Sequence, residues 1–154
     1  MRVHNFEQGT DEWFAARCGI ITASEMKSVM AKGQGATRRK YMNQLIGERL
    51  SGVPKNNFSN AHMDRGHEFE PMAREAYEFV TATSVDQVGF ITNLDDIGTI
   101  GFSPDGLVGR DGFIEIKKME AHILIDVIRR KRVPPEHKPQ IQAGLAVSER
   151  GWCD

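Results

Sequence analysis

The sequence has only two cysteines, Cys18 and Cys153, and they lie far apart in a chain of 154 residues. Two distant cysteines cannot supply the disulfide framework of a small secreted domain, and they form no metal-spaced cluster. We therefore expect neither a disulfide-stapled fold nor a cysteine-based metal centre. The expected compartment is the cytoplasm.

Long apolar runs are also missing. No stretch approaches the roughly 20 consecutive apolar residues that a membrane helix needs, so no membrane partner is expected. The N-terminal residues Met1–His4 begin no apolar signal region. The five histidines show no metal-ligand spacing, and the net charge of −1 gives no overall basic footprint for nucleic acid.

Two short basic runs do occur, Arg38–Lys40 and Arg129–Arg132. Such a run is usually a solvated helix surface, and it becomes interesting for binding only if an acidic site lies nearby. The hydrophobic fraction of 40% and the charged fraction of 27% are ordinary for a globular protein. We expect residues 1–154 to form a single domain.

Capping residues predict a first half rich in helices. Thr10, Thr22 and Thr37 are each followed by an apolar helical pattern, and Thr22–Glu25 has the sequence of a capping box. A glycine follows each of these patterns and is expected to end the helix. Further helices are expected around Phe69–Tyr77, with an apolar face toward the core, over Ile123–Ile128, and around Gln140.

Strand patterns lie between these helices. Val85–Asn93 and Ile97–Phe102 are predicted to be strands. Asp111-Gly112 is a hairpin signal between Leu107-Val108 and Phe113–Ile116. The order of helices, a short meander and further helices predicts an α/β (α+β) fold with a small central mixed sheet flanked by helices.

Residues 103–117 carry the candidate chemistry. Asp105 follows Ser103-Pro104 at the end of a predicted strand. Glu115 and Lys117 are two residues apart, so in a strand their side chains share one face. A hairpin at Asp111-Gly112 brings Asp105 back toward Glu115. The sequence therefore predicts two carboxylates and one ammonium group around a common point.

This combination suits a metal-dependent reaction on phosphate. Hard cations such as Mg²⁺, with Mn²⁺ as the alternative, take oxygen ligands, and the carbonyl of Ile116 could join the two carboxylates. The metal would polarise the phosphate and acidify a water, while Lys117 would orient or deprotonate that water or neutralise developing charge. On these residues alone, an ordinary edge hairpin with solvent-facing charges stays open as the alternative.

Four motifs together resemble one family. Asp105 with Glu115-Ile116-Lys117 resembles the core signature of the PD-(D/E)xK nuclease superfamily. The other three motifs are similar to those of the phage lambda exonuclease, or YqaJ-like viral recombinase, family: Gly9–Trp13 with Arg17–Glu25, Arg65–Glu70, and Pro139–Gln142. The motifs occur in family order and span nearly the whole chain.

The resemblance implies a restriction-endonuclease-like core and gives each motif a role. It implies that Asp105 and Glu115 bind the metal and that Lys117 is the catalytic lysine. Glu70 matches an acid that supports the metal shell directly or through water. Gln140 matches a glutamine that contacts the nucleophile or the phosphate side of the site.

Arg17 and Ser24 match the residues that hold the DNA 5′-phosphate in this family. The physical chemistry is compatible, because a helix N-terminus favours an anion and an arginine can bind phosphate through two parallel hydrogen bonds. On the residues alone, helix capping by Ser24 and a helix-dipole role for Arg17 remain alternatives.

The resemblance implies a magnesium-dependent exonuclease that degrades linear double-stranded DNA from 5′ ends in phage recombination, inside the bacterial host cell. It also implies a ring-shaped homotrimer and a single-strand annealing protein as partner. An endonuclease on the same core and a non-catalytic DNA-binding remnant remain alternatives. Lambda-type exonucleases continue past the position of Asp154, so a truncated domain, a degraded prophage gene and a minimal variant are all open interpretations.

Overall fold

Thr10 begins the first helix of the computed structural model, as the sequence predicts. Its side chain accepts a hydrogen bond from the backbone N–H of Trp13 at 3.4 Å, and two acids occupy the first turn. The structure describes residues 1–32, 35–55, 61–95 and 98–154, and the side chains of all of these except residues 61–68, 94 and 95.

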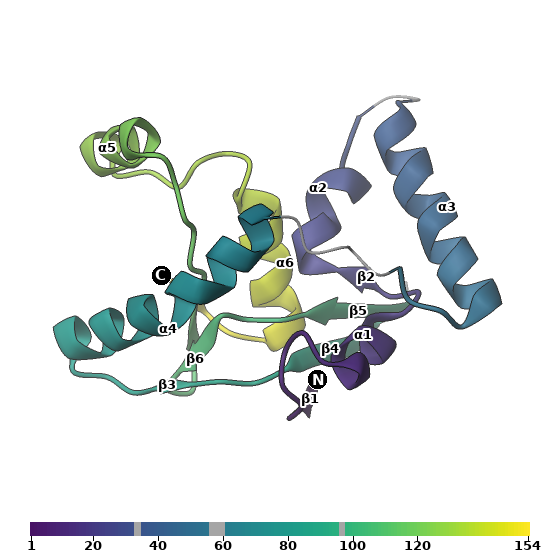
Figure 1. The fold of residues 1–154 in the computed structure, drawn as a ribbon, viewed down its shortest axis with the longest axis horizontal. Helices are drawn as coiled ribbons and strands as arrows, with labels where there is room; N and C mark the ends of the chain where they lie inside the picture. The colour runs from purple at the N-terminus through teal and green to yellow at the C-terminus, as the bar shows by residue number, and fades with distance from the viewer. Residues whose placement is uncertain (33–34, 56–60, 96–97) are drawn as a thin grey trace.

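Most helices of the first half precede a run of five strands, and two further helices and a short strand follow that run (Figure 1). The helices are α1 (Asp11–Arg17), the 3-10 turn η1 (Ala23–Glu25), α2 (Met26–Val29), α3 (Ala36–Ser51), α4 (Ala61–Thr81), α5 (Ala121–Arg130) and α6 (Lys138–Ser148). The strands are β1 (Arg2–His4), β2 (Ile21–Thr22), β3 (Val85–Asp86), β4 (Phe90–Asp95), β5 (Gly98–Phe102), β6 (Gly106–Val108), β7 (Gly112–Ile114) and β8 (Trp152–Cys153).

The strands form two small mixed sheets, whereas the sequence predicted one. The strand order is β1-β4-β5-β2 in the first sheet and β3-β6-β7-β8 in the second. The pairs β2–β5 and β7–β8 are parallel, and the other neighbours are antiparallel. The predicted hairpin is present, with Leu107 opposite Phe113. The mixed α/β class is confirmed, and the link from β5 to β6 joins the two sheets.

The predicted strand over Val85–Asn93 is divided into β3 and β4. Gly89 lies in the gap, where the N-terminal segment crosses the chain. A Cβ atom on Gly89 would lie 2.0 Å from the carbonyl oxygen of Phe6, and the Gly89 N–H donates to the carbonyl of His4 at 3.1 Å. This crossing holds residues 5–9 against the start of β4, close to the β5–β6 link.

The predicted helix after Thr22 is also shorter than expected. Thr22 belongs to β2, where it pairs with Gly101, and its hydroxyl lies 3.2 Å from that of Ser24 instead of capping a helix. The segment continues as η1 and the four-residue α2. The third helix begins at Ala36 with Gly35 as its N-cap, so Thr37 lies inside the helix and does not cap it.

Two phenylalanines at the junction of the sheets position α6. The rings of Phe102 and Phe113 meet edge to face, with centroids 4.9 Å apart. Gly144 of α6 packs directly on both, because a Cβ there would lie 2.9–3.0 Å from the two rings. The close approach holds the face of α6 that also carries Gln140, one turn earlier.

Helices at the periphery bury less than their patterns predicted. On α4, Phe69 is 44% exposed and Met72 is 65% exposed, so the expected apolar face is not buried there. Helix α5 has no buried residue and stands apart from both sheets (Figure 1). In the described part of the chain, no helix combines the length and the hydrophobicity needed to cross a bilayer.

Candidate active site

The two predicted carboxylate segments meet at the ends of β6 and β7. Asp105 lies in the β5–β6 link, and its Oδ2 accepts a hydrogen bond from the backbone N–H of Ile116 at 2.5 Å. Glu115 and Lys117 follow β7, which ends at Ile114. They are therefore not strand residues, yet the Lys117 ammonium still forms an ion pair with Glu115.

Glu115 is the most enclosed acid of the site. Its side chain is only 5% exposed. Its Oε1 accepts hydrogen bonds from Lys117 Nζ and from Gln140 Nε2, the latter at 2.5 Å. Its Oε2 is buried and has no hydrogen-bond partner in the described part of the chain. Two other predicted site residues thus converge on one oxygen of the Glu115 carboxylate, and the second oxygen has no partner among the described residues.

The electrostatics of the site disfavour two negative charges without a cation. Burial raises the pKa of Asp105 to about 7, and the nearby charge of Glu115 adds to the shift. Burial also raises the pKa of Glu115, although the neighbouring Lys117 ammonium acts in the opposite direction. A group that brings positive charge to these carboxylates would therefore be bound favourably.

The donor set fits a hard divalent cation. A buried carboxylate oxygen without a partner is costly, and an ion at Glu115 Oε2 would remove that cost. Among the described residues, no three His, Cys, Asp or Glu side chains enclose a metal by themselves. Two carboxylates that leave the remaining positions to water and phosphate match the usual coordination of Mg²⁺.

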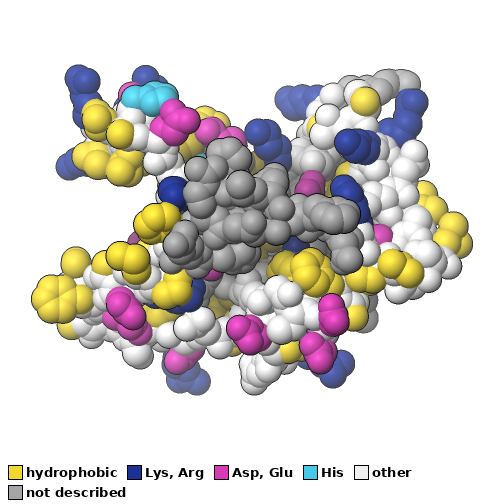
Figure 2. All heavy atoms as spheres, viewed as in Figure 1, with side chains coloured by type: hydrophobic (Ala, Val, Ile, Leu, Met, Phe, Trp, Pro, Cys, Tyr) yellow, Lys and Arg dark blue, Asp and Glu magenta, His cyan; other side chains and the backbone are white. Residues whose placement is uncertain are grey.

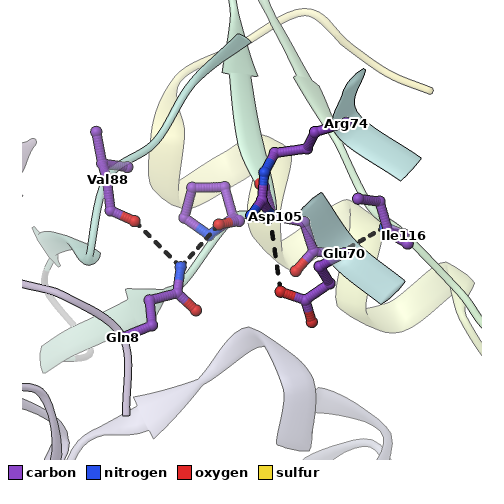
Figure 3. A network of polar contacts seen from close by, with 7 residues as sticks. Gln8, Glu70, Arg74, Val88, Asp105 and Ile116 are labelled. Atoms are coloured by element: carbon purple, nitrogen blue, oxygen red, sulfur yellow. Dashed lines mark hydrogen bonds and ion pairs between the residues drawn. The ribbon is translucent and has the colours of Figure 1, made fainter. Parts of the chain in front are cut away.

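A polar network holds Asp105 from the other side (Figure 3). Arg74 Nη1 donates to the backbone carbonyl of Asp105 at 3.1 Å and lies 3.8 Å from Glu70 Oε2. Gln8 Nε2 donates to the carbonyls of Val88 and Pro104, at 3.1 and 2.9 Å. Glu70 therefore lies beside the site, next to Arg74. A cavity of about 660 Å³ opens along this network.

Replacement of Arg74 by Met should weaken metal binding more than it weakens the fold. The guanidinium is the cation between Glu70 and the backbone of Asp105, and its side chain is 13% exposed. We expect the Mg²⁺ concentration for half-maximal DNA cleavage to rise about tenfold, the range for residues that orient metal ligands. Arg74→Lys should restore part of the loss, because it keeps the charge.

The matched control is Arg130→Met, which removes another i,i+4 ion pair. The Arg130 Nε lies 2.9 Å from Asp126 Oδ1, and the arginine side chain is 71% exposed. This control should leave the Mg²⁺ requirement unchanged. Equal Mg²⁺ requirements in Arg74→Met and the parent protein would show that Arg74 does not position the metal ligands.

Arg17 and Ser24, the predicted 5′-phosphate residues, have different surroundings. The Arg17 guanidinium stacks 4.0 Å from the ring centroid of Trp13, and its Nη1 donates to Ser103 Oγ at 2.9 Å. Burial lowers the pKa of Arg17 to about 10. Ser24 is exposed and lies in a three-residue 3-10 turn, so the expected helix N-terminus is not present there.

The sequence interpretation did not single out Gln8 or Arg74 as site residues. Arg74 could have been found, because it follows the predicted acid Glu70 by four residues and shares its helix face. Gln8 lies in a loop, and its partners Val88 and Pro104 are 80 and 96 residues away. No local pattern indicates such contacts. The first four residues of the Arg65–Glu70 motif have side chains outside the described part of the structure.

Comparisons with known proteins bear on the fold and on the family. A family model described as the YqaJ-like viral recombinase domain matches residues 12–151. The crystal structure of the alkaline exonuclease LHK-Exo from Laribacter hongkongensis is similar, with 43% identity and a TM-score of 0.82, covering 94% of this chain and 71% of that chain. The structure of LHK-Exo in complex with dAMP has 44% identity, the same TM-score and the same coverage. No curated protein sequence matches the chain.

Proposed function

The chain belongs to the YqaJ-like viral recombinase domain family, and we propose on that basis that it is a DNA exonuclease of phage-type recombination. The similarity to an alkaline exonuclease over most of both chains supports this activity and the predicted restriction-endonuclease-like fold. The finer proposal is a magnesium-dependent enzyme that degrades linear double-stranded DNA from its 5′ ends.

The main support for the proposal is the arrangement of contacts around the Glu115 carboxylate. Next to Asp105, Glu115 has one oxygen engaged by Lys117 and Gln140 and a second, buried oxygen that has no partner among the residues the structure describes. We call the two buried carboxylates Asp105 and Glu115 the acid pair. Such a pair is destabilising when it is ionised, because the negative charge of each carboxylate makes ionisation of the other less favourable. The pair can bind a cation and, through that cation, a phosphate, and this binding offsets the cost of burying two carboxylates.

The chain's own residues then have distinct tasks in phosphodiester hydrolysis. A divalent cation bound by Asp105 and Glu115 would supply a Lewis acid for the scissile phosphate and for a water. Lys117 lies at the same carboxylate and can orient the attacking water or neutralise charge that develops on the phosphate. Gln140 holds Glu115 in place through its amide N–H. Arg74 and Gln8 fix the backbone around Asp105.

The end preference rests on Arg17 and Ser24. Ser103 links Arg17 to the segment that carries Asp105, so a phosphate held near Arg17 would lie close to the metal ligands. A bound 5′-phosphate would place the first phosphodiester bond of the strand within reach of the acid pair. The homotrimer and the single-strand annealing partner, both implied by the family resemblance, belong to the same proposal.

Linear duplex DNA labelled at the 5′ or the 3′ end provides the test, with Mg²⁺, Mn²⁺ or EDTA and with a closed circular duplex as control. We expect metal-dependent degradation from 5′-phosphorylated ends, slower degradation from 5′-hydroxyl ends, and an intact circle. Cutting of the circle would identify an endonuclease. DNA binding without cleavage in any metal would identify a binding module that has lost its chemistry.

A further inference from the structure

A second cavity, of about 430 Å³, lies between Glu115 and the end of α5 with the segment that follows it. Glu115 and Lys117 line one part of this cavity, and Lys131 and Arg132, the first two residues after α5, line another. We call it the α5 cavity. Its apolar lining includes Met119, Val127, Val133, Pro134 and Ile141.

Of the cations that line the α5 cavity, Lys131 and Arg132 have no acidic partner among the described residues. Neither Lys131 nor Arg132 forms an ion pair with any residue in the described ranges. The acids that line the cavity are otherwise engaged. Glu115 is paired with the lysine of the site, and Asp154 Oδ2 accepts a hydrogen bond from a tyrosine hydroxyl at 2.8 Å. Lys131 and Arg132 therefore bring positive charge to the cavity beside Glu115 and Lys117, and Asp154 is the other carboxylate of its lining.

The backbone at Lys131 makes glycine a well-tolerated substitution there. Lys131 ends α5 in the left-handed conformation, with φ 48°, and its N–H donates to the carbonyl of Val127 at 2.8 Å. Glycine is the residue that fits this position best, and any other residue costs about 1 kcal/mol there. A lysine at this position makes the helix end less stable than a glycine would.

We propose that Lys131 and Arg132 form a DNA-backbone site, which binds phosphates next to the one that is cut. This proposal rests on the nuclease function proposed above. The apolar lining offers few hydrogen-bond partners for base edges, so the site would recognise phosphate alone. Backbone recognition is independent of sequence, as an exonuclease acting on any DNA requires. Figure 2 shows Lys and Arg side chains on the surface around α5, together with Asp, Glu and His side chains.

The test measures the affinity for a short 5′-phosphorylated duplex in EDTA, where binding is separated from cleavage. We expect Lys131→Gly and Arg132→Gln each to weaken binding about tenfold near 0.1 M salt. Each should also reduce the slope of log Kd against log salt concentration by about 1. Lys131→Gly should keep or increase the melting temperature, because glycine relieves the left-handed backbone. If Lys131→Gly binds DNA more weakly while its melting temperature is unchanged or higher, unfolding does not explain the weaker binding.

The matched control is Arg110→Gln, an exposed cation in the β6–β7 turn, at the far end of the hairpin from the acid pair. It should leave both affinity and slope unchanged. Slopes for Lys131→Gly and Arg132→Gln equal to that of the control would overturn the proposal, even if the parent protein cleaves DNA. A parent that binds through this pair but never cleaves DNA would keep the backbone site and reject the nuclease function. A parent without measurable DNA affinity would reject both.

Discussion

Replacing Asp105 with Asn is expected to abolish DNA cleavage and, at the same time, to stabilise the metal-free protein. Asparagine keeps an oxygen that can accept the hydrogen bond from Ile116 but removes one of two buried negative charges. We expect cleavage to fall about 1000-fold, equivalent to about 4 kcal/mol of lost transition-state stabilisation by the metal. At pH 8 the free energy of unfolding of the metal-free variant should exceed that of the parent by about 1–3 kcal/mol, because the variant no longer buries that charge.

The raised pKa of Asp105 determines how the stability of the metal-free protein changes with pH. The pKa of Asp105 is raised to about 7 in the folded protein from a usual value near 3.8, so the folded state binds the proton more tightly. The stability of the metal-free parent should therefore fall as the pH rises from about 4 to about 7. Asp105→Asn should remove that part of the fall. Thermal unfolding at pH 5 and pH 8, with and without Mg²⁺, measures the effect.

Two comparisons complete the experiment. Mg²⁺ should raise the melting temperature of the parent at pH 8 and have little effect on Asp105→Asn, since a ligand stabilises only the state that binds it. Asp111→Asn, at an exposed acid in the hairpin turn, is the matched control and should change neither activity nor stability. Equal Mg²⁺ stabilisation of the parent and Asp105→Asn would show that Asp105 is not a metal ligand.

Replacing Lys117 with Met should also abolish cleavage but shift the stability in the opposite direction. The ammonium pairs with Glu115, whose side chain is almost fully buried. Removal of the ammonium leaves the carboxylate without its cation, so the free energy of unfolding of the metal-free protein should fall by about 1–2 kcal/mol. The effect is not larger because the Lys117 side chain is 29% exposed. Single-turnover cleavage should slow about 100- to 1000-fold, as expected for the loss of a charge-stabilising group.

The neighbouring Lys118 is the matched control. Its ammonium lies 3.9 Å from the ring centroid of Phe69 on α4, and it makes no ion pair in the described part of the chain. Lys118→Met should change the cleavage rate less than about threefold, since an exposed cation–π contact stabilises by only about 0.5–1 kcal/mol. If Lys117→Met and Lys118→Met cleave at similar rates, Lys117 has no special role in the reaction.

Local patterns in the sequence predicted the elements whose hydrogen bonds close within a few residues. Thr10 caps α1, Asp111-Gly112 turns the hairpin, and a helix carries Gln140, all as predicted. The motifs also named the acids and the lysine of the site in advance, although their chemical roles remain predictions. Each of these features depends on residues that are neighbours in sequence, so composition and spacing are informative.

Where contacts span the chain, local patterns failed. Thr22 was expected to cap the next helix through its side chain, but pairing with Gly101 holds Thr22 in a strand and the helical segment after it is short. One strand was expected across Gly89, but the crossing of the N-terminal segment divides it. The expected apolar face of α4 is largely exposed at Phe69 and Met72. In the first two cases a distant segment decides the conformation, and on α4 the packing of the whole chain decides the burial; no local pattern records either.

The sequence by itself therefore named the candidate residues for the chemistry: Asp105, Glu115 and Lys117 from their spacing, and Gln140 from the family resemblance. The tertiary structure alone decided their electrostatics. It buries Glu115 with one oxygen unpaired, aims Gln8 and Arg74 at the backbone around Asp105, and leaves the cations after α5 open beside the acids. Desolvation and charge–charge interactions depend on distance and burial in three dimensions, and a linear sequence specifies neither until the chain is packed.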